Sequence, residues 1–400
     1  MRHKYLFIIY SILFIGSLIS CTEAFEIEDN GFESYLVVEG KITNQLKFQE
    51  ILLSNTLPLT ANNAVEIENY SVNVTDNLGN TFNFQEIENG IYRSVTEFNA
   101  FPGVSYQLNI TSNSGISYQS NAMILPDLSE LDQIYAEEVN NEYIQILADG
   151  RSTENGKYFR YEYEETYKVI APFHSNMDAT VENLTYDFLG TPEFDIVISP
   201  REQEEQICYV SENSKEIILG QTENLSSNIV SRVPIRKIAF DNSIIKTRYS
   251  ILVKQYSESL EAYTFYKILK DLGNIDNVLS QSQPGSIQGN IASTNSTKNV
   301  IGFFDVVTEQ EQRIFFNYTD FSGDEPAYFF ECDYLILDYE DTSSGPPPTG
   351  DGDSNERAIL LDRLMNKNYK YVGGNYEIVN PECGDCTSFG SNIIPDFWTE

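Results

Sequence analysis

The sequence predicts a mainly β protein, in which an N-terminal immunoglobulin-like β-sandwich is followed by a larger β-rich domain that carries one prominent α-helix. Short segments that alternate apolar and polar residues recur about every 8–12 residues with turn residues between them, which is typical of antiparallel sandwiches. Only one long segment has helical periodicity. Hydrophobic residues make up 41% of the 400 residues and include 26 Tyr and 24 Phe, so the chain can build packed cores.

The start of the chain predicts a lipoprotein signal peptide over residues 1–20. Arg2 and Lys4 give a positive start, and the apolar run at 5–19 is shorter than the roughly 20 residues that a membrane-spanning helix needs. The letters LISC at 18–21 resemble a bacterial lipobox, in which a lipid is attached to the cysteine thiol and a peptidase cuts before it. Cys21 is therefore the expected lipidation site, and the attached acyl chains would anchor the mature protein to a membrane. An ordinary secreted protein with an incidental cysteine is the alternative.

Residues 21–29 form an acidic tether after the predicted cleavage site. Without the two basic residues of the signal peptide, 25 − 2 = 23 basic residues face 60 acidic ones, so the mature chain has a formal charge of 23 − 60 = −37. A surface this acidic repels nucleic acid and anionic bilayers. The simplest meaning of the charge itself is a soluble exterior that resists aggregation.

Residues 30–125 predict the immunoglobulin-like sandwich. SYLVVEGKIT and FQEILLSN supply its first strands. Tyr70, Val72 and Val74 then alternate with polar residues in YSVNVTD, and the turn NLGN leads into a similar pattern in TFNFQE. SYQLNIT repeats the alternation, and SNSG turns the chain into ISYQSN. These strands and turns fit one antiparallel domain.

Residues 126–400 predict the second, β-rich domain, which follows the linker LPDLSELD at 125–132. GKYFRYEYEETYKVIAP is a long aromatic strand, and EFDIVIS, ICYVSE, RYSILVKQYS, VIGFFDVV and RIFFNY predict further strands. The acidic, Pro/Gly-rich stretch 342–356 predicts an exposed loop before a cysteine-rich end.

The one strong helix is expected near residues 257–273. Ser257 or Ser259 can cap its start, and Gly273 supplies a stop signal. Spacings of three and four residues place five apolar side chains on one stripe, which we expect to be buried. These are Ala262, Phe265, Tyr266, Leu269 and Leu272.

Four cysteines remain beyond the predicted anchor: Cys208, Cys332, Cys383 and Cys386. An even number of cysteines in an exported chain predicts two disulfides, and three pairings are possible. The C-x-x-C at 383–386 also matches redox and zinc motifs. A zinc site would need further ligands, however, and the mature chain has one histidine, His174. A redox motif should open a helix in a βαβ unit, whereas this one lies among Gly and Ser near the C-terminus. Structural disulfides are the expected role.

We expect no cofactor and no firm metal site. The acidic loop offers one weak calcium candidate, because Asp351, Asp353, Asn355 and Asp362 occupy positions 1, 3, 5 and 12 of a calcium-loop template. Position 6 of that template should be Gly and is Glu356 here. A solvated acidic loop is the simpler interpretation.

The motifs of common enzymes are missing from the sequence, so we expect that the protein is not an enzyme. There is no G-x-S-x-G motif, and PGSIQGN is not followed by the Lys-Ser/Thr of a phosphate loop. A carboxylate pair for glycoside hydrolysis stays open, because 60 acidic residues make chance pairs inevitable. The excess of Tyr and Phe is explained by β-sheet cores.

Several segments resemble a family of Bacteroidota lipoproteins, a domain of unknown function commonly encoded beside TonB-dependent outer-membrane receptors. They are the lipobox, YLVVEGKITN at 35–44, YFRYEYEETYKVIAP with Glu165 and Thr166, EAYTFYKILK, PGSIQGNI with NVIGFF, and the end from Cys383 and Cys386 to IIPDFW with Pro395, Phe397 and Trp398. The chain departs from the family in having Tyr where Trp is frequent and in its Pro-rich acidic loop, which looks like an insertion.

The resemblance implies a lipid-anchored protein of the outer membrane that faces the cell exterior and works with a TonB-dependent β-barrel receptor. Acidic residues soon after the lipidated cysteine favour surface export in this phylum, and Glu23, Glu26, Glu28 and Asp29 fit that pattern. The expected role is a non-catalytic accessory in nutrient uptake, either capturing substrate or acting as a lid. A structural or assembly subunit of an outer-membrane complex and an adhesin or peptide-binding module are the alternatives. The ligand stays open.

Overall fold

The computed structural model describes residues 34–57, 69–188, 192–223, 228–273, 289–340, 356–374 and 376–400. The predicted signal peptide, Cys21 and the acidic tether lie outside these residues, as do PGSIQ at 284–288 and all of the loop at 342–356 except Glu356. Within the described ranges, no helix is both long and apolar enough to cross a membrane.

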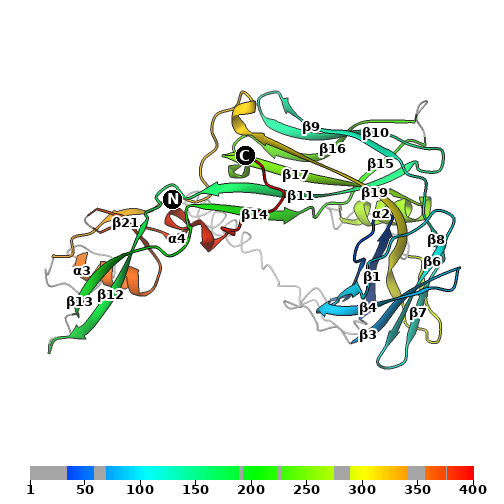
Figure 1. The fold of residues 1–400 in the computed structure, drawn as a ribbon, viewed down its shortest axis with the longest axis horizontal. Coiled ribbons are helices and arrows are strands. Elements are labelled where there is room, and N and C mark those ends of the chain that lie inside the picture. Colours follow the sequence, from blue (N-terminus) through cyan, green and yellow to red (C-terminus); the bar gives the residue numbers. More distant parts are fainter. Residues whose placement is uncertain are drawn as a thin grey trace, which may run out of the picture.

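The chain folds into three parts, which we call the sandwich, the body and the arm (Figure 1). The fold is mainly β, as the sequence predicts. In the sandwich, the alternating segments bury one face of each strand, so that Val72, Val74, Leu108 and Ile110 fill its core. Its strands from the N-terminal third are β1 (Leu36–Thr43), β2 (Glu50–Asn55), β3 (Tyr70–Asp76), β4 (Thr81–Glu88), β5 (Ile91–Ser94), β6 (Ser105–Ser112), β7 (Ser117–Ser120) and β8 (Met123–Ile124).

The body packs two sheets face to face. The sheet β16–β10–β9 covers the strands β14, β11, β17 and the second half of β19, with Phe159, Tyr161 and Ile146 in the shared core. The C-terminal residues lie against the body, where Trp398 packs edge-on against Tyr209 and Phe315. The body strands are β9 (Glu130–Val139), β10 (Tyr143–Arg151), β11 (Tyr158–Ile170), β14 (Ile207–Asn213), β15 (Ile218–Gln221), β16 (Ile229–Ala239), β17 (Arg248–Glu258) and β19 (Val300–Asn317), with 3-10 helices at Ser243–Ile245 and Tyr318–Asp320.

Strand β19 joins the sandwich to the body. Its first half pairs in parallel with β1, from Leu36↔Val300 to Thr43↔Val307, and its second half pairs antiparallel with β17. Gly302 is required here, because its φ is +138° and a Cβ would lie 2.0 Å from the carbonyl oxygen of Val38. The short β18 (Ile291–Ser293) also pairs with β7. The sandwich therefore includes strands from far outside the expected range of 30–125, since sequence alternation says nothing about partners distant in the chain.

Helix α2 (Leu260–Gly273) is the expected helix and packs at this junction. Ser259 caps it by accepting a hydrogen bond from the backbone N–H of Ala262 at 3.1 Å. Of the five residues of the predicted stripe, Ala262, Phe265 and Tyr266 are buried. Leu269 and Leu272 are only half-buried, because the last turns of the helix extend beyond the core. The helix thus contacts both β19, which is shared with the sandwich, and β11 of the body.

The arm extends from the body on the side opposite the sandwich (Figure 1). It combines a long hairpin, a small sheet in the order β20–β22–β21 and helix α3 around Leu337, Leu360 and Ile378. Helix α3 was not predicted, because it is short and follows the acidic loop directly. The arm's elements are β12 (Met177–Tyr186), β13 (Pro192–Pro200), β20 (Tyr334–Ile336), α3 (Glu356–Met365), β21 (Lys370–Gly373), β22 (Glu377–Val379), α4 (Pro381–Gly384) and a 3-10 helix at Cys386–Ser388.

Candidate functional site

The predicted disulfides form, and each cysteine of the C-x-x-C bonds to a distant partner. Cys208 of β14 pairs with Cys386, and Cys332 pairs with Cys383, with Cα atoms 5.7 and 5.8 Å apart. The two bonds fasten the base of the arm to the body. Because Cys383 and Cys386 are not bonded to each other, the motif is not a redox dithiol in this state, and its sulfurs are not available to zinc.

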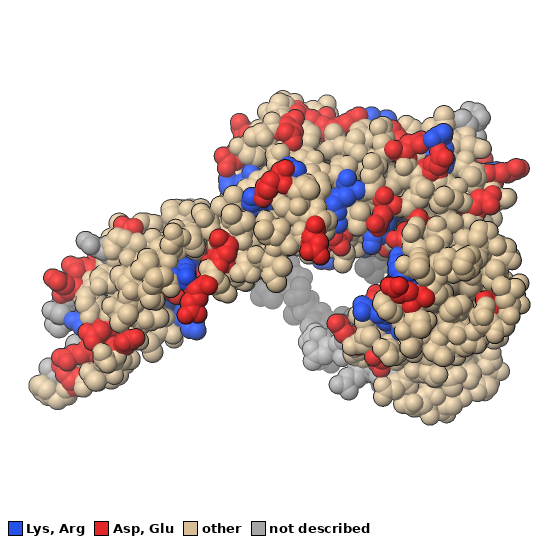
Figure 2. Space-filling view, in the orientation of Figure 1, with Lys and Arg blue, Asp and Glu red and all other residues tan. Residues whose placement is uncertain are grey.

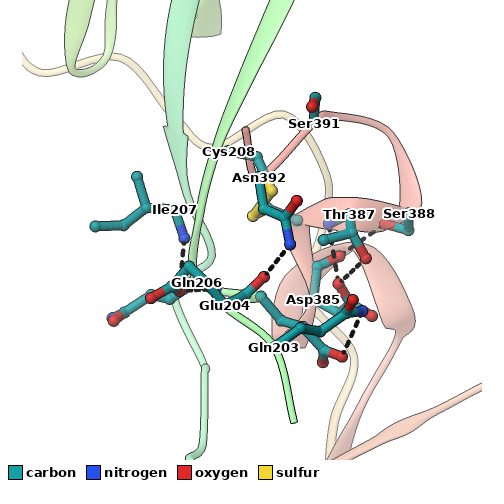
Figure 3. The surroundings of a disulfide bond; sticks show 12 residues. Gln203, Glu204, Gln206, Ile207, Cys208, Asp385, Thr387, Ser388, Ser391 and Asn392 are labelled. Carbon is teal, nitrogen blue, oxygen red and sulfur yellow. Dashed lines mark hydrogen bonds between the residues drawn. A yellow bond between two sulfur atoms is a disulfide. The ribbon is translucent and has the colours of Figure 1, made fainter. Parts of the chain in front are cut away.

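Ordered polar contacts surround the Cys208–Cys386 bond (Figure 3). The carboxylate of Glu204 accepts the backbone N–H of Gln206 at 2.6 Å, and the Glu204 carbonyl accepts the Asn392 amide at 2.8 Å. Asp385 accepts the N–H of Thr387 at 2.9 Å and pairs with Lys370 at 2.7 Å. Burial opposes the charge of Asp385, but Lys370 and Thr387 lower its pKa. These contacts indicate a structural role.

The calcium candidate is only partly described. Asp362 lies in α3 and accepts a hydrogen bond from the Asn366 amide at 2.8 Å. Asp351, Asp353 and Asn355 lie outside the described residues. Among the residues that are described, no three His, Cys, Asp or Glu side chains are grouped so that they could hold a metal ion. The calcium site therefore stays a prediction.

A buried charged cluster, which no sequence motif predicted, lies at the junction of sandwich and body. At its centre, Arg160 of β11 pairs with Glu258 of β17 through Nε and with Glu162 through Nη1. Arg160 is 5% exposed and Glu258 is 1% exposed. The Arg160 guanidinium also lies over the ring of Tyr266 in α2, 4.2 Å from the ring centroid. The Arg160 guanidinium thus links β11 and β17 of the body to helix α2.

The sandwich contributes to the same cluster through β1 and β19. Lys41 of β1 donates to Glu162 at 2.7 Å, and Tyr256 donates to the same carboxylate at 3.0 Å. Asp305 of β19 is 1% exposed and accepts the backbone N–H of Val306 at 2.9 Å. We call Lys41, Arg160, Glu162, Glu258 and Asp305 the junction cluster.

Burial and neighbouring charges shift the pKa values of the three carboxyl groups of the junction cluster in different directions. Burial opposes the charge of Glu162, but Lys41 and Arg160 lower its pKa to about 2. Burial raises the pKa of Glu258, while Arg160 opposes the rise. Burial and the neighbouring Glu258 raise the pKa of Asp305 well above its usual value. The positive charges of Lys41 and Arg160 balance the negative charges of Glu162 and Glu258. Asp305 has no cation bonded to it, so we assign the proton at neutral pH to Asp305.

A cavity of about 340 Å³ opens beside the junction cluster, at the small end of the range for ligand pockets. Its walls come from β1, β11, the turn between β14 and β15, β17 and α2. Four carboxylates and three cations line it, so it suits a small polar ligand that carries both hydrogen-bond donors and acceptors. The charged lining residues are Glu39, Glu162, Glu164, Glu216, Arg160, Lys215 and Lys254.

The cavity does not offer an obvious acid and base pair. A general acid needs a raised pKa and contact with the substrate, and the two carboxyl groups with raised pKa values, Glu258 and Asp305, are each 1% exposed. Glu162 is held ionised, and Glu164 pairs with Arg313 at 3.0 Å. The arrangement favours binding, and the absence of enzymatic activity stays a prediction.

Glu165 and Thr166, the two residues at family-like positions, lie inside the body. Glu165 is 5% exposed, receives both guanidinium contacts of Arg236 at 3.1 Å and accepts the Tyr249 hydroxyl at 2.6 Å. Thr166 is fully buried, and its hydroxyl lies 2.8 Å from that of Ser211. Both therefore stabilise the body. The sequence indicates a buried acidic group more clearly at Asp305, which is the only acidic residue in the apolar run VIGFFDVV.

A family model described as "Domain of unknown function (DUF4249)" matches residues 22–313, which is more than half of the chain. The match includes every residue of the junction cluster and ends before the C-x-x-C. A search of curated proteins finds no match.

Proposed function

Given that the chain belongs to the DUF4249 family, we propose that it is a surface-exposed outer-membrane lipoprotein and a non-catalytic accessory of a TonB-dependent transporter, which captures substrate or acts as a lid. The proposed function has three parts: export with a lipid anchor, capture of a ligand in a cavity, and binding to a β-barrel partner. Each part rests on different residues.

The pairing of the cysteines is the observation that carries the proposal. The chain has five cysteines, and four of them form two disulfides. Disulfides persist in oxidising compartments outside the cytoplasm, which supports export. The remaining cysteine is Cys21, directly after the apolar run. A single cysteine at that position is what lipid attachment requires.

The cavity beside the junction cluster supports substrate capture. A purely structural subunit without a ligand would not need a cavity lined by both signs of charge at the meeting point of two domains. The resemblance of the sequence to lipoproteins encoded beside TonB-dependent receptors supports a barrel as the partner. The Bacteroidota origin rests on the same resemblance.

Site-specific photo-crosslinking tests whether the cavity side faces a barrel. Lys215 is exposed on the rim of the cavity, and Lys237 is exposed on β16, in the other sheet of the body. Each lysine is replaced in turn by a photoreactive amino acid in the native lipoprotein, and the crosslinked products are identified by mass spectrometry. We expect barrel peptides from position 215 and not from the matched position 237. Crosslinks to the barrel from neither position would contradict the proposal.

A further inference from the structure

Across the first half of β4 and the neighbouring strands β3, β6 and β7, the outward side chains of the sandwich sheet are polar and uncharged. These segments read TFNFQ at 81–85 of β4, YSVNVTD, SYQLNITS and SYQS, and their inward residues alternate with outward Ser, Thr, Asn and Gln. Beyond them, β4 ends in the exposed Ile87 and Glu88. Alternation alone requires polar residues on a solvent face, but it does not require that all of them lack charge. We call this surface the amide face.

Four amide side chains form a continuous row across the amide face. Asn83 is opposite Asn73, Asn73 is opposite Asn109, and Asn109 is opposite Gln119 in the strand register. The amide of Asn109 donates to Asn73 Oδ1 at 3.1 Å, and that of Gln119 donates to Asn109 Oδ1 at 2.9 Å. The row is thus pre-ordered across neighbouring strands, which lie about 4.8 Å apart.

The amide face differs from the rest of a highly charged protein. The whole chain has 25 basic and 60 acidic residues. On the outer surface of the body, by contrast, Arg232 of β16 pairs with Glu137 of β9 at 2.6 Å. Figure 2 shows the contrast, because the visible side of the lobe that contains β3, β6 and β7 has few charged side chains, whereas many are scattered over the body.

We propose that the amide face binds a neutral polysaccharide. A primary amide offers two donors and an acceptor oxygen, and the row uses only part of this capacity: among the described residues, Asn73 Nδ2 and Gln119 Oε1 have no hydrogen-bond partner and lie on the solvent side. Sugar hydroxyl groups are both donors and acceptors, so they match such an array. This binding does not depend on a barrel partner.

Charge argues against other occupants of the amide face. A second copy of the chain would bring another formal charge of −35, and nucleic acids and acidic polymers would be repelled in the same way. An apolar partner would leave the amides without hydrogen bonds, which costs free energy at each buried group. An uncharged hydroxyl-rich polymer avoids both penalties.

The affinity per sugar is expected to be low, because each hydrogen bond replaces one to water and contributes about 1 kcal/mol. A polymer compensates by presenting many equivalent units to the face. The appropriate probe is therefore a long chain and not a monosaccharide.

Affinity electrophoresis of the intact protein tests the proposal, since its charge gives high mobility in native gels. The gels contain soluble starch, glucomannan or xyloglucan as neutral probes, or polygalacturonate as an anionic one. We expect at least one neutral polymer to retard the protein and polygalacturonate not to. The double variant Asn73→Asp/Asn109→Asp should weaken the retardation at least tenfold.

The matched control is Asn140→Asp/Asn141→Asp, which adds the same two charges in the exposed β9–β10 turn, where both residues have φ near +55° and Asp is tolerated. It should be retarded as strongly as the native protein. If the first variant fails to fold, the milder Asn83→Ala/Gln119→Ala, which shortens the row at its ends, takes its place with the same expectation. Retardation by no neutral polymer, or equal retardation of face and control variants, would overturn the proposal.

Discussion

The proton assigned to Asp305 predicts an unusual response to pH. Replacing Asp305 by Asn keeps an acceptor for the Val306 N–H, bonded at 2.9 Å, and removes the group that titrates. Burial and Glu258 raise the pKa of Asp305 in the folded protein. In the unfolded chain an aspartate titrates near pH 4. Between these two pKa values, folding takes up a proton, so the native protein loses stability as the pH rises.

The size of the effect follows from linkage. Each pH unit above about 4 costs the native protein about 1.4 kcal/mol relative to the Asn variant, until the folded pKa is reached. Between pH 4 and 6 the variant should therefore gain about 3 kcal/mol over the native protein. Urea unfolding of both proteins at pH 4, 5 and 6 measures this difference. A difference that does not change with pH would mean that Asp305 is ionised and that the assignment is wrong.

Glu258 provides the contrast, because we assign it as the ionised partner of Arg160, to which it is bonded. Replacing Glu258 by Gln leaves a buried guanidinium with one carboxylate fewer and should cost about 3 kcal/mol at pH 7. If Glu258→Gln were neutral and Asp305→Asn destabilising, the two assignments would have to be exchanged.

Three further changes test the fold. Gly302→Ala should destabilise the β1–β19 pairing by more than about 2 kcal/mol, since φ is +138° and the new Cβ would clash with Val38. Gly115→Ala, in an open turn with φ +85°, bears only the backbone strain and is the control. Thermal melting of both variants measures the difference. Cys332→Ser/Cys383→Ser opens a bond between residues 51 apart and should cost the arm about 4 kcal/mol, seen as faster hydrogen exchange in β20–β22 with β10 unchanged. Tyr249→Phe removes the 2.6 Å hydrogen bond to buried Glu165 and should cost about 2 kcal/mol in urea unfolding, and an effect no larger than that of Tyr143→Phe would contradict this role.

Local patterns in the sequence were sufficient for the strands and for the main helix. Val72 and Val74 face the core because alternation places them there, and Ser259 caps α2 because its side chain acts on the next turn. These interactions involve neighbours in the chain, which a sequence displays directly.

Contacts between distant residues were not predictable in the same way. The pairing of Leu36 with Val300 and that of Cys208 with Cys386 depend on how whole sheets meet. The junction cluster has the same origin, since Lys41, Arg160 and Asp305 come from strands far apart in sequence. Only the lone Asp305 in an apolar run hinted at a buried polar contact.

The most direct test of the proposed function is a mild-detergent pull-down of the tagged native lipoprotein from outer membranes, quantified by mass spectrometry. The Cys21→Ser protein, which cannot be lipidated, is the control. Recovery of a TonB-dependent barrel in stoichiometric amount with the native protein, and its loss with Cys21→Ser, is the expected result. Recovery of no barrel, or of an assembly machine in its place, would contradict the account and favour an adhesive or structural role.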